Sequence, residues 1–274
     1  MLTTTPDAHD VMALRRCCED GSLELRYQPE VDLATGAIVA MEALLHWHHP
    51  QRGLLSPAAF LELAQAGGEI VAIGSWELTQ AAAEAVRWQS LAGAPRRLWL
   101  HMTVGQISAP GFVAQVAQVI QDAGLAPGAL GLEISEGVDR RLDDNAVPLL
   151  VALRNAGVAL AVDDLGNWLS TLGAIATLPV DAVKLGDRYV RHLGEDGAND
   201  ATVAEVIDQA HARGMIVVAE GVHAWGEAAR LTELGCDRAH GWLYASPQRA
   251  ERARWLLQYG AGWRQSTGIP LPRS

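Results

Sequence analysis

The sequence has few cysteines and no long apolar run, and each shortage excludes a class of protein. Its three cysteines, Cys17, Cys18 and Cys236, have no C-x-x-C spacing, so we do not expect a disulfide framework. No apolar run approaches the roughly 18 residues of a membrane span. The opening MLTTTPDAHD also lacks the basic and apolar regions of a signal peptide. We therefore expect a cytoplasmic protein without a membrane span.

The charge of the chain excludes another class. The formal net charge is −11 and no lysine or arginine cluster occurs, which argues against binding to duplex nucleic acid. Lysine is almost absent: 20 of the 21 basic residues are arginine, and the single lysine, Lys184, ends the apolar run VDAVK. Lysine carries a compact charge and adjusts its pKa more readily than arginine. This lysine is either a chance retention or a residue with a specific role.

Strand-like and helix-like segments alternate along the chain. With 274 residues, 49% of them hydrophobic, and no linker-like stretch, the sequence predicts one large core. About eight strands in β-then-α order favour an α/β fold of the TIM-like barrel type over a doubly wound sheet. No GxGxxG motif follows the first strand, which also disfavours a dinucleotide-binding sheet.

The expected elements are as follows. Strands are predicted at 22–32, 37–47, 97–104, 129–135, 158–162, 180–184 and 215–219, with a short segment at 237–240. Helices are predicted at 8–20, 57–92, 110–123, 145–155, 201–213, 225–234 and 247–258. A barrel over residues 20–260 would follow a helical lead-in over residues 1–19 and precede a tail over residues 261–274.

Nearly every predicted strand ends on a polar or charged side chain. In an α/β barrel the chemistry lies where strands end and the following loops begin, so these side chains should meet at one mouth. One such residue alone is more often structural, whereas a set on consecutive strands indicates a site. The set consists of Glu42, His101, Glu133, Asp163, Asp164, Lys184, Glu220 and His240.

The charge of this set favours metal ions. Five carboxylates face one lysine, a net charge of −4, and like charges in contact raise each other's pKa. Two divalent cations would neutralise the site, and oxygen ligands with at most one imidazole suit Mg²⁺ or Mn²⁺. Two such ions are the usual clamp for attack on a phosphodiester, and one of the adjacent Asp163 and Asp164 would bridge them. An internal ion-pair network without metal is the alternative.

Ordered motifs from about Asp20 to Pro247 resemble the EAL domain family, bacterial phosphodiesterases that linearise cyclic di-GMP. The triplet Glu42-Ala43-Leu44 lies in YQPEVDLATGAIVAMEALLHWHHPQRGLLSP. It is followed, in order, by LEISE, AVDDLG, LPVDAVKL, AEGV and GCDRAHGWLYASP. The resemblance implies a modified TIM-like (β/α) barrel with one antiparallel strand, which agrees with the early pair of strands.

The resemblance also implies a role for each matching residue. The expected metal ligands are Glu42, His101, Glu133, Asp163, Asp164 and Glu220. Lys184 is expected to orient the attacking hydroxide, so the catalytic residues would be Glu42, Lys184 and Glu220. Glu136 matches a glutamate that steadies the loop after the aspartates. The residues expected to contact the substrate are Gln28, Leu44, His46, Asp187, His240 and Pro247.

The sequence departs from the family pattern at several positions. His101 replaces a metal-binding asparagine, and because imidazole is a competent ligand we expect an altered metal preference. His46 replaces an arginine that contacts phosphate. The other departures are Gly186 for an acidic residue, with Asp187 one position out of register, His223 for a glutamate, His240 for a glutamine and Trp168 for a loop glycine.

Three functions stay open at this point. The retained carboxylates and Lys184 favour a slow phosphodiesterase that converts cyclic di-GMP to linear pGpG with Mg²⁺ or Mn²⁺. The lost phosphate arginine and the altered loop favour either a catalytically inactive cyclic di-GMP receptor or a protein-interaction module. A homodimer and a protein partner are compatible with all three.

Overall fold

One mixed sheet closes on itself through its first strand. The computed structural model describes residues 8–91, 97–134, 146–163, 178–191, 193–194 and 198–259. The strand order is β1-β9-β8-β7-β6-β5-β4-β2-β3, and β1 also pairs with β2, so eight strands form a ring from which the short β3 extends. The strands are β1 (Leu23–Asp32), β2 (Ile38–His49), β3 (Gly53–Leu55), β4 (Arg97–Met102), β5 (Leu130–Ile134), β6 (Ala159–Val162), β7 (Ala182–Leu185), β8 (Ile216–Ala219) and β9 (Arg238–His240).

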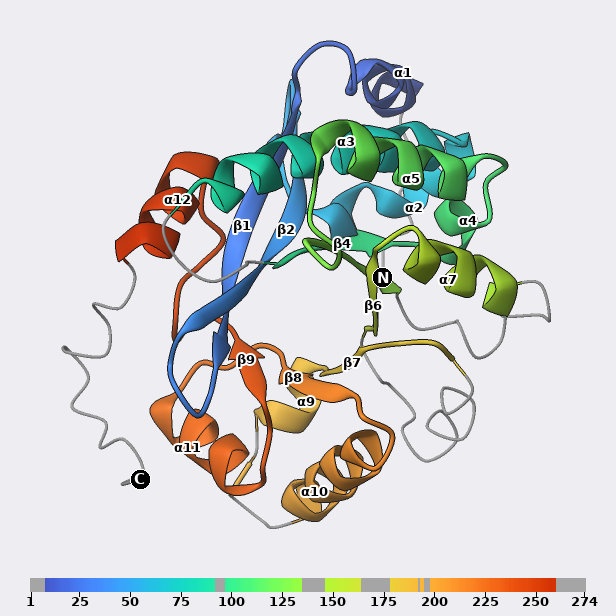
Figure 1. Cartoon of the computed structure of the whole chain (residues 1–274). Helices are drawn as coiled ribbons and strands as arrows, with labels where there is room; N and C mark the ends of the chain where they lie inside the picture. The colour runs from blue at the N-terminus through green and yellow to red at the C-terminus, as the bar shows by residue number, and fades with distance from the viewer. Residues whose placement is uncertain are drawn as a thin grey trace.

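The helices lie around the outside of this ring (Figure 1). They carry the chain from one parallel strand to the next, as parallel pairing requires. The helices are α1 (Ala8–Arg16), η1 (Pro57–Ala59), α2 (Leu61–Gly67), α3 (Ile70–Gln89), α4 (Val104–Ile107), α5 (Phe112–Ala123), α7 (Ala146–Asn155), α9 (Asp187–Val190), α10 (Ala198–His211), α11 (Trp225–Glu233) and α12 (Ala250–Tyr259). No helix among the described residues is both long enough and apolar enough to cross a membrane.

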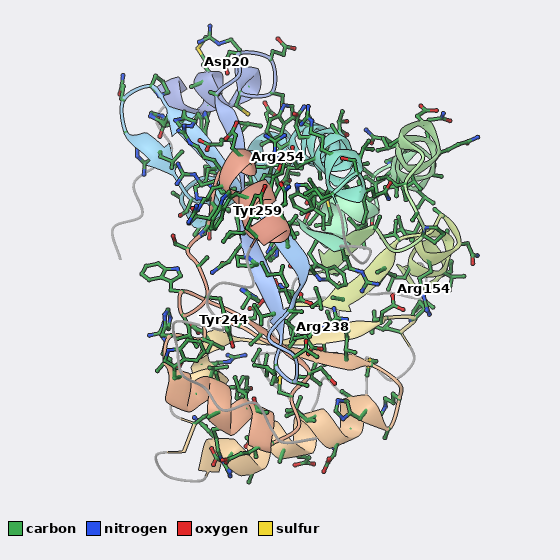
Figure 2. The ribbon with its side chains drawn as sticks, turned by 60° about the vertical axis from the view of Figure 1, so that its left-hand side comes forward. Asp20, Arg154, Arg238, Tyr244, Arg254 and Tyr259 are labelled. Atoms are coloured by element: carbon green, nitrogen blue, oxygen red, sulfur yellow. The ribbon has the colours of Figure 1, made fainter. Side chains whose placement is uncertain are left out.

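β1 is the antiparallel strand of the ring. It pairs antiparallel with both β2 and β9, whereas the other neighbours in the ring are parallel. Its register sets Gln28 opposite Glu42 and Glu30 opposite His240. Arg238 of β9, labelled in Figure 2, donates from Nη1 to Glu30 Oε1 of β1 at 2.8 Å. The expected barrel with one antiparallel strand is therefore confirmed.

The interior of the barrel is filled in layers. Side chains two residues apart on a strand point to the same face, so the inward-facing residues of one strand enter successive layers. Trp99, fully buried, packs with Ala40, Ala161 and Ala182 in a cluster separate from the main core. Gly131 is the partner of Trp99 in the neighbouring strand. Small residues on four strands thus make room for one indole.

Some element boundaries differ from the expected ones. The helix predicted over 57–92 is interrupted: α2 ends at Gly68, which takes a left-handed conformation (φ 83°), and α3 starts afresh at Ile70. The short β3, which pairs with the end of β2, was not predicted. Helix α1 joins the main core through Leu14, and His49 Nε2 lies 3.0 Å from Asp10 Oδ1. The helical lead-in therefore packs on the barrel.

We predict that Gly131→Ala destabilises the protein by about 1–3 kcal/mol, the usual cost of overpacking a core. A Cβ atom at position 131 would lie 2.1 Å from Trp99 Cε3, so the indole or the strand must shift. The measurement is the free energy of unfolding in denaturant. Gly226→Ala is the matched control, because a Cβ there meets nothing within 4 Å and alanine favours the helix. Equal stabilities of the two variants would contradict the layer packing.

Candidate active site

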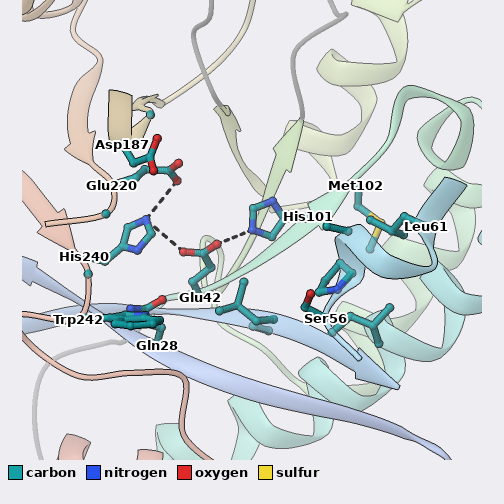
Figure 3. Close-up of a pocket in the computed structure, with 18 of the residues that line it drawn as sticks. Gln28, Glu42, Ser56, Leu61, His101, Met102, Asp187, Glu220, His240 and Trp242 are labelled. Carbon is teal, nitrogen blue, oxygen red and sulfur yellow. Dashed lines mark hydrogen bonds and ion pairs between the residues drawn. The ribbon is translucent and has the colours of Figure 1, made fainter. Parts of the chain in front are cut away.

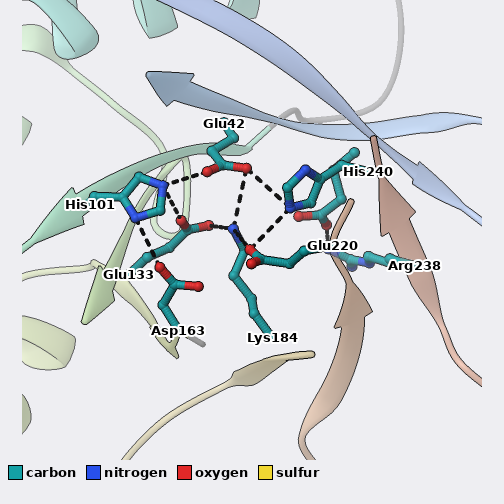
Figure 4. A network of polar contacts seen from close by, with 9 residues as sticks. Glu42, His101, Glu133, Asp163, Lys184, Glu220, Arg238 and His240 are labelled. Carbon is teal, nitrogen blue, oxygen red and sulfur yellow. Dashed lines mark hydrogen bonds and ion pairs between the residues drawn. The ribbon is translucent and has the colours of Figure 1, made fainter. Parts of the chain in front are cut away.

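The polar residues expected at one mouth lie together in the layer above Trp99. Each lies two positions after Trp99 or after one of the small residues around it. The pairs are Glu42 after Ala40, His101 after Trp99, Glu133 after Gly131, Asp163 after Ala161 and Lys184 after Ala182. Glu220, just after β8, and His240, at the end of β9, complete the group (Figure 4). The periodicity of two therefore carries each polar side chain to the same end of the barrel.

Lys184 is the centre of this group. Its ammonium Nζ lies 2.7 Å from Glu133 Oε1, 2.9 Å from Glu220 Oε1 and 3.3 Å from Glu42 Oε2. The side chain is only 1% exposed. Burial alone would lower the pKa of Lys184, but the attraction of the three carboxylates raises this pKa well above its ordinary value. The residue is therefore a buried, permanently charged ammonium.

The imidazole of His101 contacts three carboxylates. Its Nε2 hydrogen-bonds Glu42 and lies 3.1 Å from Glu133 Oε2, while its Nδ1 lies 3.1 Å from Asp163 Oδ2. Burial lowers the pKa of His101, but the charges of Glu133 and Glu42 outweigh it and raise this pKa well above its ordinary value. In the absence of metal, His101 therefore carries a proton.

His240 closes the opposite side of the group. Its Nε2 lies 3.1 Å from Glu220 Oε1 and 3.2 Å from Glu42 Oε2. Burial acts to lower the pKa of His240, yet Glu42 raises it above its ordinary value. Glu42 thus lies between two imidazoles, one on β4 and one on β9 (Figure 4).

The carboxylates differ in charge state because their partners differ. Burial would raise the pKa of Glu42, but Lys184 and the two histidines hold this pKa well below its usual range. Burial likewise opposes ionisation of Asp163, but the hydrogen bond and charge of His101 lower its pKa to about 2. Burial raises the pKa of Glu133 to about 8, because the attraction of Lys184 only partly offsets it. Among the carboxyl groups around Lys184 and His101, Glu133 therefore has the raised pKa and releases its proton least readily.

Two groups of side chains here suit metal ions. Glu42, His101 and Glu133 form one group, and Glu42, Glu220 and His240 form the other; within each, one ligand atom per residue lies within 4.8 Å of the rest. Glu42 Oε2 and both oxygens of Glu133 are buried and accept no hydrogen bond in the described structure, although cationic side chains lie within ion-pair distance. Oxygens without donors are what a hard divalent cation requires, so these residues fit Mg²⁺ or Mn²⁺.

A cavity of about 980 Å³ opens over this group. Four of the expected substrate residues line it, namely Gln28, Leu44, Asp187 and His240. Glu42 lies between the two ends of this cavity: Gln28, Trp242 and His240 are on one side, and Ser56, Leu61 and Met102 on the other (Figure 3).

His46 and Pro247, which we expected at the substrate, do not line the cavity. The His46 ring turns back on its own strand, where Nδ1 lies 2.9 Å from the carbonyl oxygen of Leu44. Pro247 precedes Gln248, which is fixed to Tyr27 by two backbone hydrogen bonds and is thereby held beside β1. Asp164, Glu136 and Trp168 lie outside the described residues.

Comparison with known proteins places these features in one family. The EAL domain sequence profile matches residues 11–247. The chain belongs to the EAL domain family.

Two curated relatives show the degree of sequence similarity. An uncharacterized protein of Mycobacterium tuberculosis is 37% identical over 245 residues, 89% of this chain and 39% of that protein. The bifunctional diguanylate cyclase/cyclic di-GMP phosphodiesterase MucR of Pseudomonas aeruginosa is 33% identical over 239 residues, 87% of this chain and 35% of MucR. The chain thus spans less than two fifths of either relative.

Solved structures agree with the barrel. The MucR phosphodiesterase in complex with c-di-GMP superposes with a TM-score of 0.83 at 32% identity, covering 89% of this chain and 99% of that one. The FimX EAL domain of Pseudomonas aeruginosa bound to c-di-GMP has a TM-score of 0.80 at 22% identity, covering 87% and 96%. At that identity the second likeness shows the fold alone.

Several side chains at the cavity of this EAL domain were not predicted from the sequence, and two of them, Trp242 and Glu77, are informative. Trp242 lines the cavity with 71% of its surface exposed. Its ring packs edge-on against the His223 imidazole, with the two ring centroids 5.7 Å apart. Glu77, on α3, lines it too, but is only 5% exposed. A signal for Glu77 was present, since it follows Ile73 and Gly74 at helical spacing on the apolar face of α3.

We predict that Glu77→Gln stabilises the metal-free protein, and increasingly so as pH rises from 5 to 8. Burial raises the pKa of Glu77 from 4.5 to about 8. Between these values the folded state binds more protons than the unfolded state, so wild-type stability falls with rising pH. The difference between variant and wild type should grow by up to about 1.4 kcal/mol per pH unit.

Denaturant unfolding in EDTA at several pH values measures this difference. Glu77→Leu should show the same slope, because it also removes the titrating group. A difference that stays constant between pH 5 and pH 8 would show that the carboxyl group is well solvated in the folded protein.

Proposed function

We propose that this EAL domain is a metal-dependent phosphodiesterase that hydrolyses cyclic di-GMP to linear pGpG. The observation that carries the proposal is the pair of ligand groups that share Glu42, with the buried ammonium of Lys184 behind them and the cavity in front. The likeness to the MucR phosphodiesterase, solved with c-di-GMP, supports the choice of substrate.

The ligand set matches the chemistry of the proposed cofactor. Mg²⁺ or Mn²⁺, when bound, supplies Lewis-acid activation of water and neutralises charge on the phosphate. The residues that would hold these ions are Glu42, His101, Glu133, Asp163, Asp164 and Glu220, with His240 beside Glu42 and Glu220 in the second ligand group. His101 and Glu133 must release their protons to act as ligands, so metal binding competes with protonation.

Lys184, Glu220 and Gln28 would orient the water, accept its proton and bind the substrate. The Lys184 ammonium, fixed by three carboxylates, donates a hydrogen bond that orients the attacking water, and Glu220 accepts the proton which that water loses. A new bond forms between this oxygen and phosphorus while the bond from phosphorus to a 3′ oxygen breaks; that oxygen takes a proton from solvent. Gln28 Nε2 donates to the carbonyl oxygen of Ala245 at 2.9 Å, which leaves the amide oxygen available to a guanine N–H.

One observation favours a catalytically inactive cyclic di-GMP receptor as the second candidate. The His101 imidazole contacts Glu42, Glu133 and Asp163, three of the groups that a metal ion needs. If this imidazole keeps its place, the cavity still accepts the dinucleotide but the water is not activated. The expected homodimer and protein partner stay predictions under either function.

Hydrolysis and binding measured together separate the two candidates. Pure protein is mixed with cyclic di-GMP and Mg²⁺ or Mn²⁺, and both bound dinucleotide and released pGpG are quantified. Turnover supports the phosphodiesterase. Binding without turnover supports the receptor, and the absence of both overturns the proposal.

We predict that Lys184→Arg lowers the hydrolysis rate by about 100-fold or more, the usual cost of misplacing a catalytic group. Lys184 is 1% exposed and touches three carboxylates, so the wider, planar guanidinium cannot place a donor at the same point without moving them. Single-turnover rates at saturating metal test this. A variant that keeps the wild-type rate would refute the role assigned to Lys184.

We predict that His101→Asn weakens the pH dependence of metal binding and shifts the preference from Mn²⁺ toward Mg²⁺. The pKa of His101 is raised, so wild-type protein must displace its proton, which costs about tenfold in affinity per pH unit as pH falls. Asparagine offers a neutral oxygen instead. Metal-induced shifts of the melting temperature at pH 6 and pH 8, without substrate, provide the readout. Identical profiles for both proteins would mean that His101 is not a ligand.

A further inference from the structure

Glu77 is an acidic residue at the cavity that the proposed hydrolysis does not use. It belongs to neither group of metal ligands. Its side chain makes no hydrogen bond or ion pair with any described residue. Only the charges of His101 and Cys18, acting at longer range, affect the pKa of Glu77 besides burial. A nearly buried carboxyl group without a partner costs stability, so its presence on an apolar helix face calls for a ligand.

The position of Glu77 within the cavity follows from its helix. Gly74, one turn earlier on α3, lies so close to α4 that a Cβ atom there would be 2.5 Å from Gln106 Nε2. Glu77 lines the cavity. Helix α3 packs against α2, β4 and α4, which carry the lining residues Leu61, Met102 and Gln106, so we assign Glu77 to the end of the cavity where Figure 3 shows Leu61 and Met102. Gln106, another polar side chain of the cavity, is engaged within the protein: its Oε1 accepts from Thr103 and its Nε2 donates to the Ile70 carbonyl.

This end of the cavity therefore combines an apolar wall with one uncommitted carboxyl group. An apolar wall suits the faces of a planar base, and the carboxyl group suits a base edge that carries adjacent N–H donors. Among the common bases, guanine presents two such donors side by side, N1–H and N2–H. Adenine instead presents an acceptor, N1, beside its 6-amino donor, so an ionised carboxylate pairs with only one of its two edge atoms.

The two ends of the cavity match the two bases of one cyclic dinucleotide. The opposite end carries the exposed indole of Trp242, a surface of the kind on which bases stack. Glu42 lies between the two ends, where the scissile phosphate must be. A base at the Glu77 end is then a natural consequence of placing the phosphate at the metal ligands.

We propose that Glu77 is a specificity-determining residue that accepts hydrogen bonds from N1–H and N2–H of one guanine of the bound dinucleotide. The inference rests on the proposed function, because it takes cyclic di-GMP as the ligand. It assigns to α3, a helix outside the barrel, the discrimination between guanine and adenine at one end of the cavity.

The test compares wild type, Glu77→Leu and Glu77→Gln in competition binding of cyclic di-GMP and cyclic di-AMP. It is done in EDTA, so that no hydrolysis occurs, and at pH 8.5, above the raised pKa of Glu77 of about 8, so that the wild-type carboxyl group is ionised. Glu77→Leu should weaken cyclic di-GMP binding by about tenfold, the usual value of a two-bond base contact. Glu77→Gln offers one acceptor and one donor, which pair with guanine or adenine. It should therefore keep most of the affinity while its preference for guanine falls by about tenfold.

Glu84→Gln is the control, because Glu84 lies two turns further along α3, is 2% exposed and does not line the cavity. Glu84 accepts hydrogen bonds from Trp88 and Arg87, so its variant should be less stable than wild type with unchanged affinity. The Glu77 variants should show the reverse: higher stability and altered affinity. A purely structural carboxyl group cannot produce that opposite pair of effects.

The possible outcomes distinguish this inference from the proposed function. If wild type binds cyclic di-GMP and both Glu77 variants match it in affinity and base preference, the role of Glu77 is refuted and the proposed function stands. If wild type binds no cyclic di-GMP, in EDTA or with Mg²⁺, both are overturned. Weaker binding by Glu77→Leu together with relaxed preference in Glu77→Gln supports the assignment.

Discussion

The cluster of ion pairs around Lys184 is the interaction on which the mouth of the barrel depends. Strands β2, β5, β7 and the end of β8 each bring one charged side chain to it, and three carboxylates lie within 3.3 Å of one ammonium. Without that ammonium, the carboxylates would repel one another at the place where the strands converge. A buried ion network of this kind rarely stabilises a fold more than apolar packing would. Its retention in a chain that otherwise uses arginine therefore points to chemistry rather than to stability.

The apolar layer around Trp99 lies directly below the charged side chains and determines their environment. Trp99 and the small side chains around it are almost completely buried, so the floor of the site is an apolar plug closed to bulk solvent. A low dielectric on one side strengthens each interaction above it and accounts for the large pKa shifts of Glu42, His101 and Lys184. Because the ligands lie two residues after the residues of the plug, a two-residue change of strand register would exchange plug for ligands, and a one-residue change would turn both to the outer face. Packing in the lower layer thus fixes the geometry of the upper one.

The convergence of the polar residues could be predicted from the sequence, because it follows from two regularities: parallel strands end at one mouth, and side chains alternate along a strand. The antiparallel β1 followed from the resemblance to the EAL domain family and from the short link between the first two strands. The directions of individual side chains were harder to predict from the sequence. His46 turns back to the Leu44 carbonyl, a rotamer choice that no sequence pattern specifies. Glu77 reaches the cavity only because Gly74 lets α3 approach α4, a contact between elements distant in sequence.

The pKa directions also explain how one set of residues can suit both a metal-free and a metal-bound state. In the forms that these pKa values favour, Glu133 is neutral and His101, His240 and Lys184 are positive, beside the negative Glu42 and Asp163. Two divalent cations would add four positive charges while Glu133 and the two histidines lose three protons, so the net charge of the group would change by only one. In the metal-free state, bound protons therefore supply the positive charge that the cations would otherwise supply. The strands would therefore not need to separate on loss of the proposed metals, since the same carboxylates stay compensated in both states.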